Sequence, residues 1–260
     1  MPVNATSTVR ELAVTVPGAT RVFEQLGIDY CCGGGRTLAD ACEKFSTPVS
    51  EVLQRLEAAA CSLNPGDKAR DWQAESLTGL SAHIVDTHHL FTKQELARLE
   101  KLLDKVCSRH GEKRPELAEL RAAFEHLKQE LIPHMLKEEQ VLFPYIARME
   151  EAVSECRAVP APFFVTVQNP VRMMMMEHDT AGDLLGQMRR ITGNYSAPAD
   201  ACISFRTLYE ALQELEADLH QHIHLENNIL FPRAVEMESA AEPDWQTAGQ
   251  EFGEHRCFGH

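Results

Sequence analysis

The sequence predicts an all-α protein, an antiparallel four-helix bundle preceded by a small helical domain. The composition favours helices, because Ala, Leu, Glu, Lys and Gln are abundant and aromatic residues make up only 7% of the 260 residues. Four long segments in the later part of the chain carry helical periodicity and are separated by turn residues. The pattern H-x-x-x-E-x-x-x-L-F-P occurs twice, as HMLKEEQVLFP from His134 and HIHLENNILFP from His222. This repeat indicates two similar helix pairs.

Residues 1–60 are expected to form the small domain, because their helical patterns are short and broken by turn chemistry. Pro17 and Gly18 mark one break, and the run DYCCGGG marks a second. Pro48 suits the first turn of a further helix. Residues 61–72, which begin CSLNPGDKAR, are expected to be a linker.

The bundle is expected over residues 73–237. Its breaks fall at the turn around Gly111, at a stretch without periodicity over 151–169, and at a Gly- and Pro-containing turn over 193–198. The remaining residues, 238–260, have little periodicity and are expected to be a flexible tail. The predicted helices cover 73–108, 116–149, 170–192 and 199–237.

Composition excludes several classes of function. No apolar run approaches the ~20 residues that a membrane span requires, and the N-terminus lacks a basic-then-apolar leader, so a cytoplasmic protein without membrane contact is predicted. The formal net charge of −14 argues against nucleic-acid binding. The eight cysteines are spread along a chain in which no export signal is recognised, which disfavours a disulfide framework. They contain no CxxC pair, which disfavours a zinc ribbon and a thioredoxin-type site.

Four histidines are spaced so that they should meet in one layer of the bundle. His89 and His134 are nearly equidistant from the first turn, and His178 and His222 are nearly equidistant from the last turn. Residues equidistant from the turn of an antiparallel hairpin lie at the same height. Each predicted helix therefore brings one histidine to a common level.

Two glutamates belong to the same layer, because Glu138 follows His134 by four residues and Glu226 follows His222 by four. Burying these groups without a cation would cost many kcal/mol. Imidazole and carboxylate ligands suit iron or manganese, and six such groups suit two ions bridged by both carboxylates. A single tetrahedral zinc site would need only four groups, and the ferritin-like Glu-x-x-His pattern is absent. The predicted ligands are His89, His134, Glu138, His178, His222 and Glu226.

Other polar residues near this layer have open roles. His88 is an alternative to His89 if the register of the helix differs by one residue. Glu130 and Glu177 are candidates for orienting a ligand imidazole, or for relaying protons or metal. His110 falls at a turn about 31 Å from His89 along a continuous helix, so it is not expected to reach the site.

Cys31 and Cys32 are adjacent and precede three glycines. A thiol just before a helix can have a lowered pKa, which makes both residues candidate reactive thiols. They could oxidise together, bind a thiophilic ion or exchange with a partner thiol; the alternative is a pair of buried thiols at a tight turn. A small domain joined to a metal bundle suggests transfer or docking rather than a second catalytic centre.

These motifs together resemble the Repair of Iron Centers family over roughly residues 6–236. The resemblance lies in IDYCCGGGRTLADAC, in MMEHDTAG and in the two repeated helices. It implies a hemerythrin-like bundle with an oxo- and carboxylate-bridged pair of non-haem irons. In that arrangement Glu138 and Glu226 would bridge, and the terminal ligands would be His89, His134, His178 and His222. It also implies repair of iron–sulfur clusters damaged by nitrosative or oxidative stress, by supplying iron to damaged client proteins.

Two other functions could use the same residues. One is a di-iron nitric oxide reductase or peroxidase, and the other is an oxygen or nitric oxide sensor with the N-terminal domain as its output. Open coordination positions would let nitric oxide or oxygen bind in each case. The sequence leaves open the client, the active redox state, and whether the protein forms a homodimer.

Overall fold

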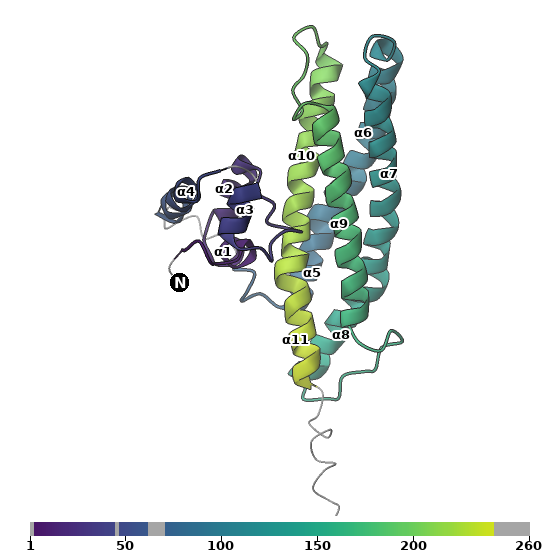
Figure 1. Ribbon diagram of the computed structural model, residues 1–260. Helices are drawn as coiled ribbons and strands as arrows, with labels where there is room; N and C mark the ends of the chain where they lie inside the picture. Colours follow the sequence, from purple (N-terminus) through teal and green to yellow (C-terminus); the bar gives the residue numbers. More distant parts are fainter. Residues whose placement is uncertain (1–2, 45–46, 62–70, 242–260) are drawn as a thin grey trace, which may run out of the picture.

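The computed structural model describes residues 3–44, 47–61 and 71–241, and its regular elements over these ranges are helices. The prediction of an all-α fold is therefore confirmed. Figure 1 shows a group of short N-terminal helices lying beside a long bundle, close to its middle. The first helix of this group begins at a capping box in which Thr8 and Glu11 each accept a backbone N–H of the other.

The N-terminal helices share a core of their own, which includes the fully buried Phe23, Leu38 and Leu56. Gly18 and Gly27 bound the second helix with φ of 79° and 68°, a left-handed conformation that favours glycine. The four helices are α1 (Val9–Thr15), α2 (Ala19–Leu26), α3 (Leu38–Lys44) and α4 (Val49–Cys61).

Four antiparallel rods form the bundle, which stands upright in Figure 1. Three of these rods contain a π-helical segment. The first rod is α5 (Leu77–His83), η1 (Ile84–His89) and α6 (Leu90–His110); the second is α7 (Glu116–Lys137), η2 (Glu138–Leu142) and α8 (Phe143–Ser154). The third rod is α9 (Gln168–Ile191), and the fourth is α10 (Ile203–Leu225), η3 (Glu226–Leu230) and α11 (Phe231–Ala241).

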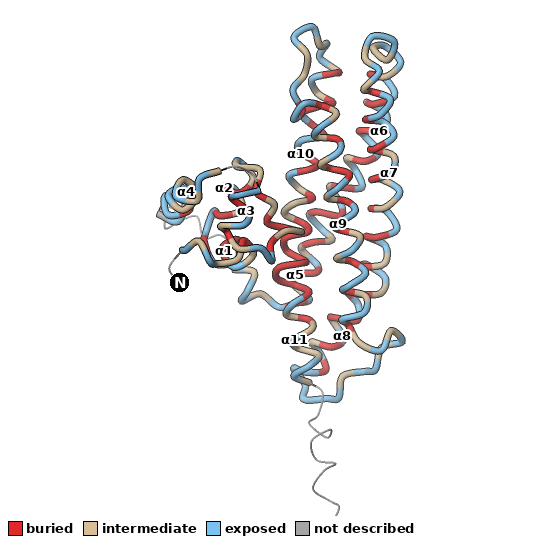
Figure 2. Tube along the Cα trace, in the orientation of Figure 1, coloured by how far each residue is buried: buried red, intermediate tan, exposed pale blue. Residues whose placement is uncertain are grey.

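Two apolar clusters fill the interior of the bundle, where buried residues line the inward faces (Figure 2). One cluster lies on the side of the hairpin turns and contains Leu99, Phe124 and Leu212. The other lies toward α8 and α11 and contains Ile146 and Phe231. The predicted metal layer falls between these two clusters, so it is shielded from water in both directions along the bundle.

The internal repeat extends beyond the two quoted motifs. Glu150 lies 12 residues after Glu138, and Glu238 lies 12 residues after Glu226. The carboxylate of Glu150 accepts the backbone N–H groups of Leu77 and Thr78 at the start of α5. Glu238 accepts the N–H of Val167 at the start of α9. In each half of the bundle, one rod therefore caps the N-terminus of the rod that precedes it.

The observed helix ends differ from the predicted ends by several residues. The first rod begins at Leu77 rather than at residue 73, because Ser76 and Glu150 cap it there. The last rod begins at Ile203 rather than at residue 199 and continues to Ala241, so residues 238–241 are helical. The rest of the expected tail, and residues 62–70 of the expected linker, lie outside the described residues. The division into domains over 1–60 and 73–237 stays a prediction.

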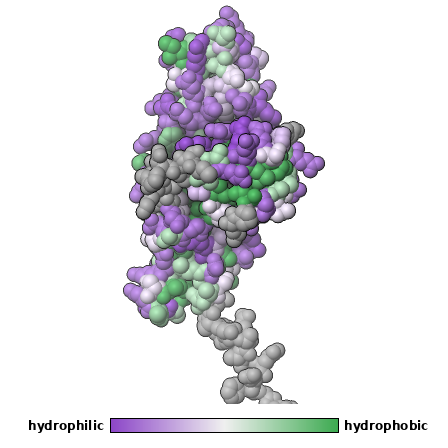
Figure 3. All heavy atoms as spheres, turned by 90° about the vertical axis from the view of Figure 1, so that its left-hand side faces the viewer, coloured by the Kyte–Doolittle hydropathy of each residue, from purple (hydrophilic) through white to green (hydrophobic). Residues whose placement is uncertain are grey.

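Hydrophilic residues (purple) cover most of the bundle above and below the N-terminal helices in Figure 3. This surface agrees with the large formal negative charge. Within the described residues, no helix combines the length and the apolarity that crossing a membrane requires.

Candidate metal centre

The four predicted histidines meet in the interior as two pairs, each joining two rods. The Nε2 atoms of His89 and His222 are 3.1 Å apart, and those of His134 and His178 are 3.0 Å apart. All four side chains are buried. Each pair combines one histidine from the first hairpin with one from the second, so the centre depends on how the two hairpins pack together.

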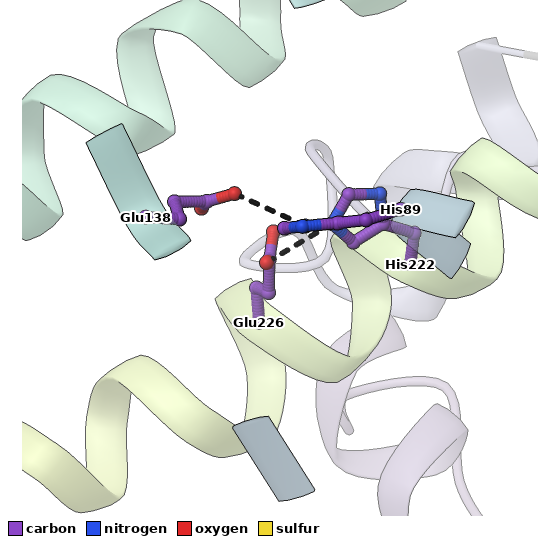
Figure 4. A group of neighbouring side chains, drawn as sticks. All are labelled: His89, Glu138, His222 and Glu226. Carbon is purple, nitrogen blue, oxygen red and sulfur yellow. Dashed lines mark hydrogen bonds and ion pairs between the residues drawn. The ribbon is translucent and has the colours of Figure 1, made fainter. Parts of the chain in front are cut away.

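Two buried carboxylates lie between these pairs, and each spans both of them. Glu138 places Oε2 3.4 Å from Nε2 of His89 and Oε1 3.4 Å from Nε2 of His134. Glu226 places Oε1 3.0 Å from Nε2 of His222 and Oε2 3.1 Å from Nε2 of His178. Figure 4 shows one half, where Glu138 and Glu226 approach the two imidazoles from separate helices. The result is two quartets that share both glutamates, one with His89 and His222, the other with His134 and His178.

Several polar atoms of this centre lack the hydrogen bonds that burial normally requires. Both carboxylate oxygens of Glu138 and Oε2 of Glu226 are buried without a hydrogen-bond partner. Such atoms are rare in folded proteins, because each costs its full desolvation free energy. Divalent cations would satisfy them, and imidazole nitrogens with carboxylate oxygens are suitable donors for such ions. The residues therefore fit a metal centre.

Two of the imidazoles are oriented so that Nε2 faces the centre. Nδ1 of His89 donates to Glu139 at 2.7 Å, and Nδ1 of His134 donates to Glu177 at 2.7 Å. Since an ionised carboxylate only accepts hydrogen bonds, Nδ1 carries a proton in both rings, and Nε2 is the nitrogen left to bind a metal ion, which would displace any proton that it carries.

His178 is held in the same way by an amide. Nδ1 of His178 donates to Oδ1 of Asn227 at 2.9 Å. The amide nitrogen of Asn227 donates in turn to the backbone carbonyl of Cys31, which fixes the direction of the amide. His222 differs, because its buried Nδ1 has no hydrogen-bond partner.

The charges of the centre compensate one another strongly. Burial raises the pKa of Glu226, but His222 and His178 outweigh it and hold this pKa well below the usual range. Burial lowers the pKa of His134, but Glu138, Glu177 and Glu226 outweigh it and raise the pKa to about 10. The hydrogen bond from His134 lowers the pKa of Glu177 to about 2. Glu226 and Glu177 are therefore ionised at neutral pH, which leaves Glu226 available to cations and Glu177 able to accept the hydrogen bond of His134.

Each of the two glutamates shared by the quartets begins a π-helical segment. The N–H of Phe143 donates to the carbonyl of Glu138, five residues back, and the N–H of Phe231 donates to the carbonyl of Glu226. A proline follows each phenylalanine, and a proline ring crowds the carbonyl four residues before it. We attribute the wider turn to relief of this crowding. The repeated Leu-Phe-Pro therefore marks a local unwinding directly after the ligand, and such bulges are frequent at functional sites.

The comparisons with known proteins agree with this geometry. Residues 80–234 match the hemerythrin HHE cation binding domain, and residues 5–60 match a domain of unknown function, DUF542. The chain is 36% identical over 225 residues to a probable iron-sulfur cluster repair protein of Haemophilus influenzae, covering 86% of this chain and 95% of that protein. It is 35% identical over 224 residues to the iron-sulfur cluster repair protein YtfE of Yersinia pestis and of Yersinia pseudotuberculosis, covering 86% and 94%.

The chain belongs to this family of iron-sulfur cluster repair proteins. The resemblance drawn from the motifs is thus confirmed, and so is a hemerythrin-like bundle preceded by a small helical region. The structure of this chain brings all six predicted ligands together in the two quartets.

The two carboxylates predicted to support the ligands have different surroundings. Glu177 contacts a ligand histidine, although the ring that it holds is His134 rather than its sequence neighbour His178. Glu130 instead lies on a half-exposed face with Oε1 3.7 Å from Nε2 of His126, which is not the position expected of a residue that orients a ligand imidazole. The helix turns Glu130 outward, because the inward positions before His134 are occupied by Leu127 and Leu131.

Sequence reasoning missed Glu139 and Asn227, which orient His89 and His178. Both residues directly follow a bridging glutamate, and this shared position in the repeat was the available signal. His88 is buried but stays outside the quartets, with Nδ1 2.9 Å from Asp218. His110 lies far along α6, where Nε2 is 3.3 Å from Sγ of Cys202.

The cysteine pair lies against the bundle beside this centre. Sγ of Cys32 is 3.5 Å from the backbone carbonyl of His178. The expectation of a lowered thiol pKa is wrong for Cys31, because the contact with Cys32, burial and Asp29 all raise the pKa of Cys31. The helix that follows begins only at Leu38, so its first N–H groups do not reach the pair.

Proposed function

We propose that this protein holds two iron ions in the buried centre and supplies iron to repair damaged iron–sulfur clusters. One observation carries the proposal: two buried quartets share Glu138 and Glu226, and three of their four carboxylate oxygens lack the hydrogen bonds that burial requires. The relatives are named iron-sulfur cluster repair proteins, and they align with most of this chain.

The donor set supports iron as the cargo. Each quartet offers two imidazole nitrogens and one oxygen from each of two carboxylates, and neither quartet contains a thiolate. Nitrogen and oxygen donors of this kind suit iron, whereas softer ions favour sulfur ligands. The two hydrogen-bonded supports, Glu139 and Glu177, keep the first hairpin's imidazoles oriented toward the centre whether or not an ion is bound.

Iron transfer tests the proposal directly. Protein loaded with ⁵⁷Fe is incubated without oxygen with an enzyme whose iron–sulfur cluster has been damaged by nitric oxide, and both proteins are separated and analysed. The proposal predicts that ⁵⁷Fe appears in the client and that client activity returns, while a Glu138→Ala/Glu226→Ala variant supports neither. Consumption of nitric oxide over many turnovers without movement of iron would instead establish a nitric oxide reductase. Reversible binding of nitric oxide or oxygen without either effect would establish a sensor.

The same proposal places the protein in the cytoplasm, where damaged iron–sulfur proteins would be its clients. Nitric oxide and oxygen would be its small ligands. Fractionation of cells that produce the full chain checks the location, and analytical ultracentrifugation of the iron-loaded protein decides between monomer and homodimer.

A further inference from the structure

A second cluster of metal-binding side chains lies outside the buried centre. Sγ of Cys31 is 3.9 Å from Sγ of Cys32 and 3.4 Å from Oδ1 of Asp29. One ligand atom from each residue lies within 4.8 Å of the other two. Both cysteines are free thiols, with Cys31 buried and Cys32 half-buried.

The distance between the two sulfurs fits ligands of one ion. A disulfide would hold them about 2.05 Å apart, far closer than observed. Two thiolates that each lie about 2.3 Å from an ion, at a tetrahedral angle, are about 3.8 Å apart. The pair is therefore spaced as it would be on a shared metal, with the Asp29 carboxylate as a third donor.

The backbone around the cluster is held in place. The carboxylate of Asp29 accepts the backbone N–H groups of Cys31, Cys32 and Gly33 at 3.1, 3.0 and 2.9 Å. A Cβ on Gly34 would lie 3.0 Å from the carbonyl oxygen of Tyr30, which is closer than most side chains approach, so the bend favours glycine there. The sulfurs are thus arranged before any ion binds, which lowers the entropic cost of binding.

The cluster is joined to the buried centre through a ligand histidine. Asn227 accepts from Nδ1 of His178 and donates to the carbonyl of Cys31. Sγ of Cys32 contacts the backbone carbonyl of His178, and a Cβ on Gly182, one turn further along α9, would lie 3.7 Å from this sulfur. The cluster therefore touches the same helix that supplies a ligand to the second quartet.

We propose that Asp29, Cys31 and Cys32 form a second metal site, which takes one thiophilic or borderline divalent cation such as Fe²⁺, Zn²⁺ or Cd²⁺. On binding, each thiol loses its proton to solvent and forms one metal–sulfur bond, without any change of oxidation state. A fourth position is left for water or for a thiolate of another protein. If the proposed function holds, this second site would bind iron transiently on its way from the buried centre to a client.

Cadmium titration of the full chain tests this site. Iron-loaded protein is titrated with Cd²⁺ without oxygen, and the sulfur-to-cadmium charge-transfer absorption is followed together with the iron and cadmium content after desalting. The proposal predicts one Cd²⁺ per chain with thiolate absorption and unchanged iron. Cys32→Ser should weaken this binding at least ten-fold, Asp29→Asn should weaken it less, and Cys156→Ser, at an exposed thiol outside the cluster, should leave it unchanged.

The absence of thiolate-bound Cd²⁺ would overturn the second site, and so would binding that persists unchanged in a Cys31→Ser/Cys32→Ser variant with intact iron content. This outcome is distinguishable from failure of the proposed function. If the protein takes up no iron but still binds Cd²⁺ through its cysteines, the second site is supported and the proposed di-iron centre is contradicted. A pair that proves to be a disulfide after isolation without oxygen would also overturn the proposal.

Discussion

At the scale of single residues, the partners of Nδ1 decide which imidazole nitrogen faces the centre. Glu139, Glu177 and Asn227 each hold one histidine from outside the quartets. Lys93 pairs with Glu139, and Lys137 pairs with Glu177, so these two supports are themselves held in place. Loss of such a support leaves the ligand present but free to rotate away from the metal.

Glu177→Ala is expected to weaken iron binding by about ten- to hundred-fold, because Nδ1 of His134 loses its acceptor. Competition with a chromophoric iron chelator measures the change. Glu130→Ala is the matched control, since Glu130 contacts His126 on a half-exposed face, and it should bind iron like the wild type. Equal weakening by both substitutions would show that Glu177 has no specific role in orienting His134.

The bridging carboxylates should matter most. Glu138→Ala or Glu226→Ala is expected to lower iron well below two ions per chain, because either change removes an oxygen donor from both quartets. Elemental analysis of the purified variants measures this. His110→Ala, at a histidine remote from the centre, should retain both ions; loss of one would contradict the placement of the centre in a single layer.

At the scale of elements, the two repeated segments share four features: a histidine, a glutamate common to both quartets, a π segment and a capping glutamate. Sequence periodicity located the four rods and the level of the ligands. It missed the π segments, because each inserts a single residue and so displaces the apolar pattern by only one position. It missed the caps by Glu150 and Glu238, because each joins segments more than 70 residues apart.

Glu150→Ala should cost about 1–2 kcal/mol of unfolding free energy, because Leu77 and Thr78 lose the acceptor for their N–H groups at the start of α5. Chemical denaturation followed by circular dichroism measures the loss. Glu151→Ala, at the adjacent exposed carboxylate that pairs with Arg157, should change stability by less than about 0.5 kcal/mol. A negligible effect of Glu150→Ala would contradict the capping role.

At the scale of the whole molecule, the N-terminal helices are held on the fourth rod next to the metal layer. Asn228 donates to the carbonyl of Tyr30 at 2.8 Å and accepts from Nε of Arg10 at 2.8 Å. Gln221 donates to the hydroxyl of Tyr30 at 2.8 Å. This docking could not be predicted from the sequence, because its contacts join residues about 190 to 220 positions apart. The hairpin spacings, by contrast, were sufficient to predict the single layer of histidines.

Asn228→Ala is expected to loosen this docking while leaving the bundle folded, since it removes the hydrogen bonds to both Tyr30 and Arg10. Hydrogen–deuterium exchange should become faster over residues 28–36 and stay unchanged in α6 and α7. Exchange that rises equally in the bundle would mean that Asn228 supports the fold as a whole instead of this contact.

Anomalous diffraction at the iron edge, from crystals of the iron-loaded protein, tests the central claim most directly. Two iron peaks are predicted, one between His89 and His222 and the other between His134 and His178, with Glu138 and Glu226 each contacting both. A single peak, or iron bound away from these six side chains, would contradict a di-iron centre.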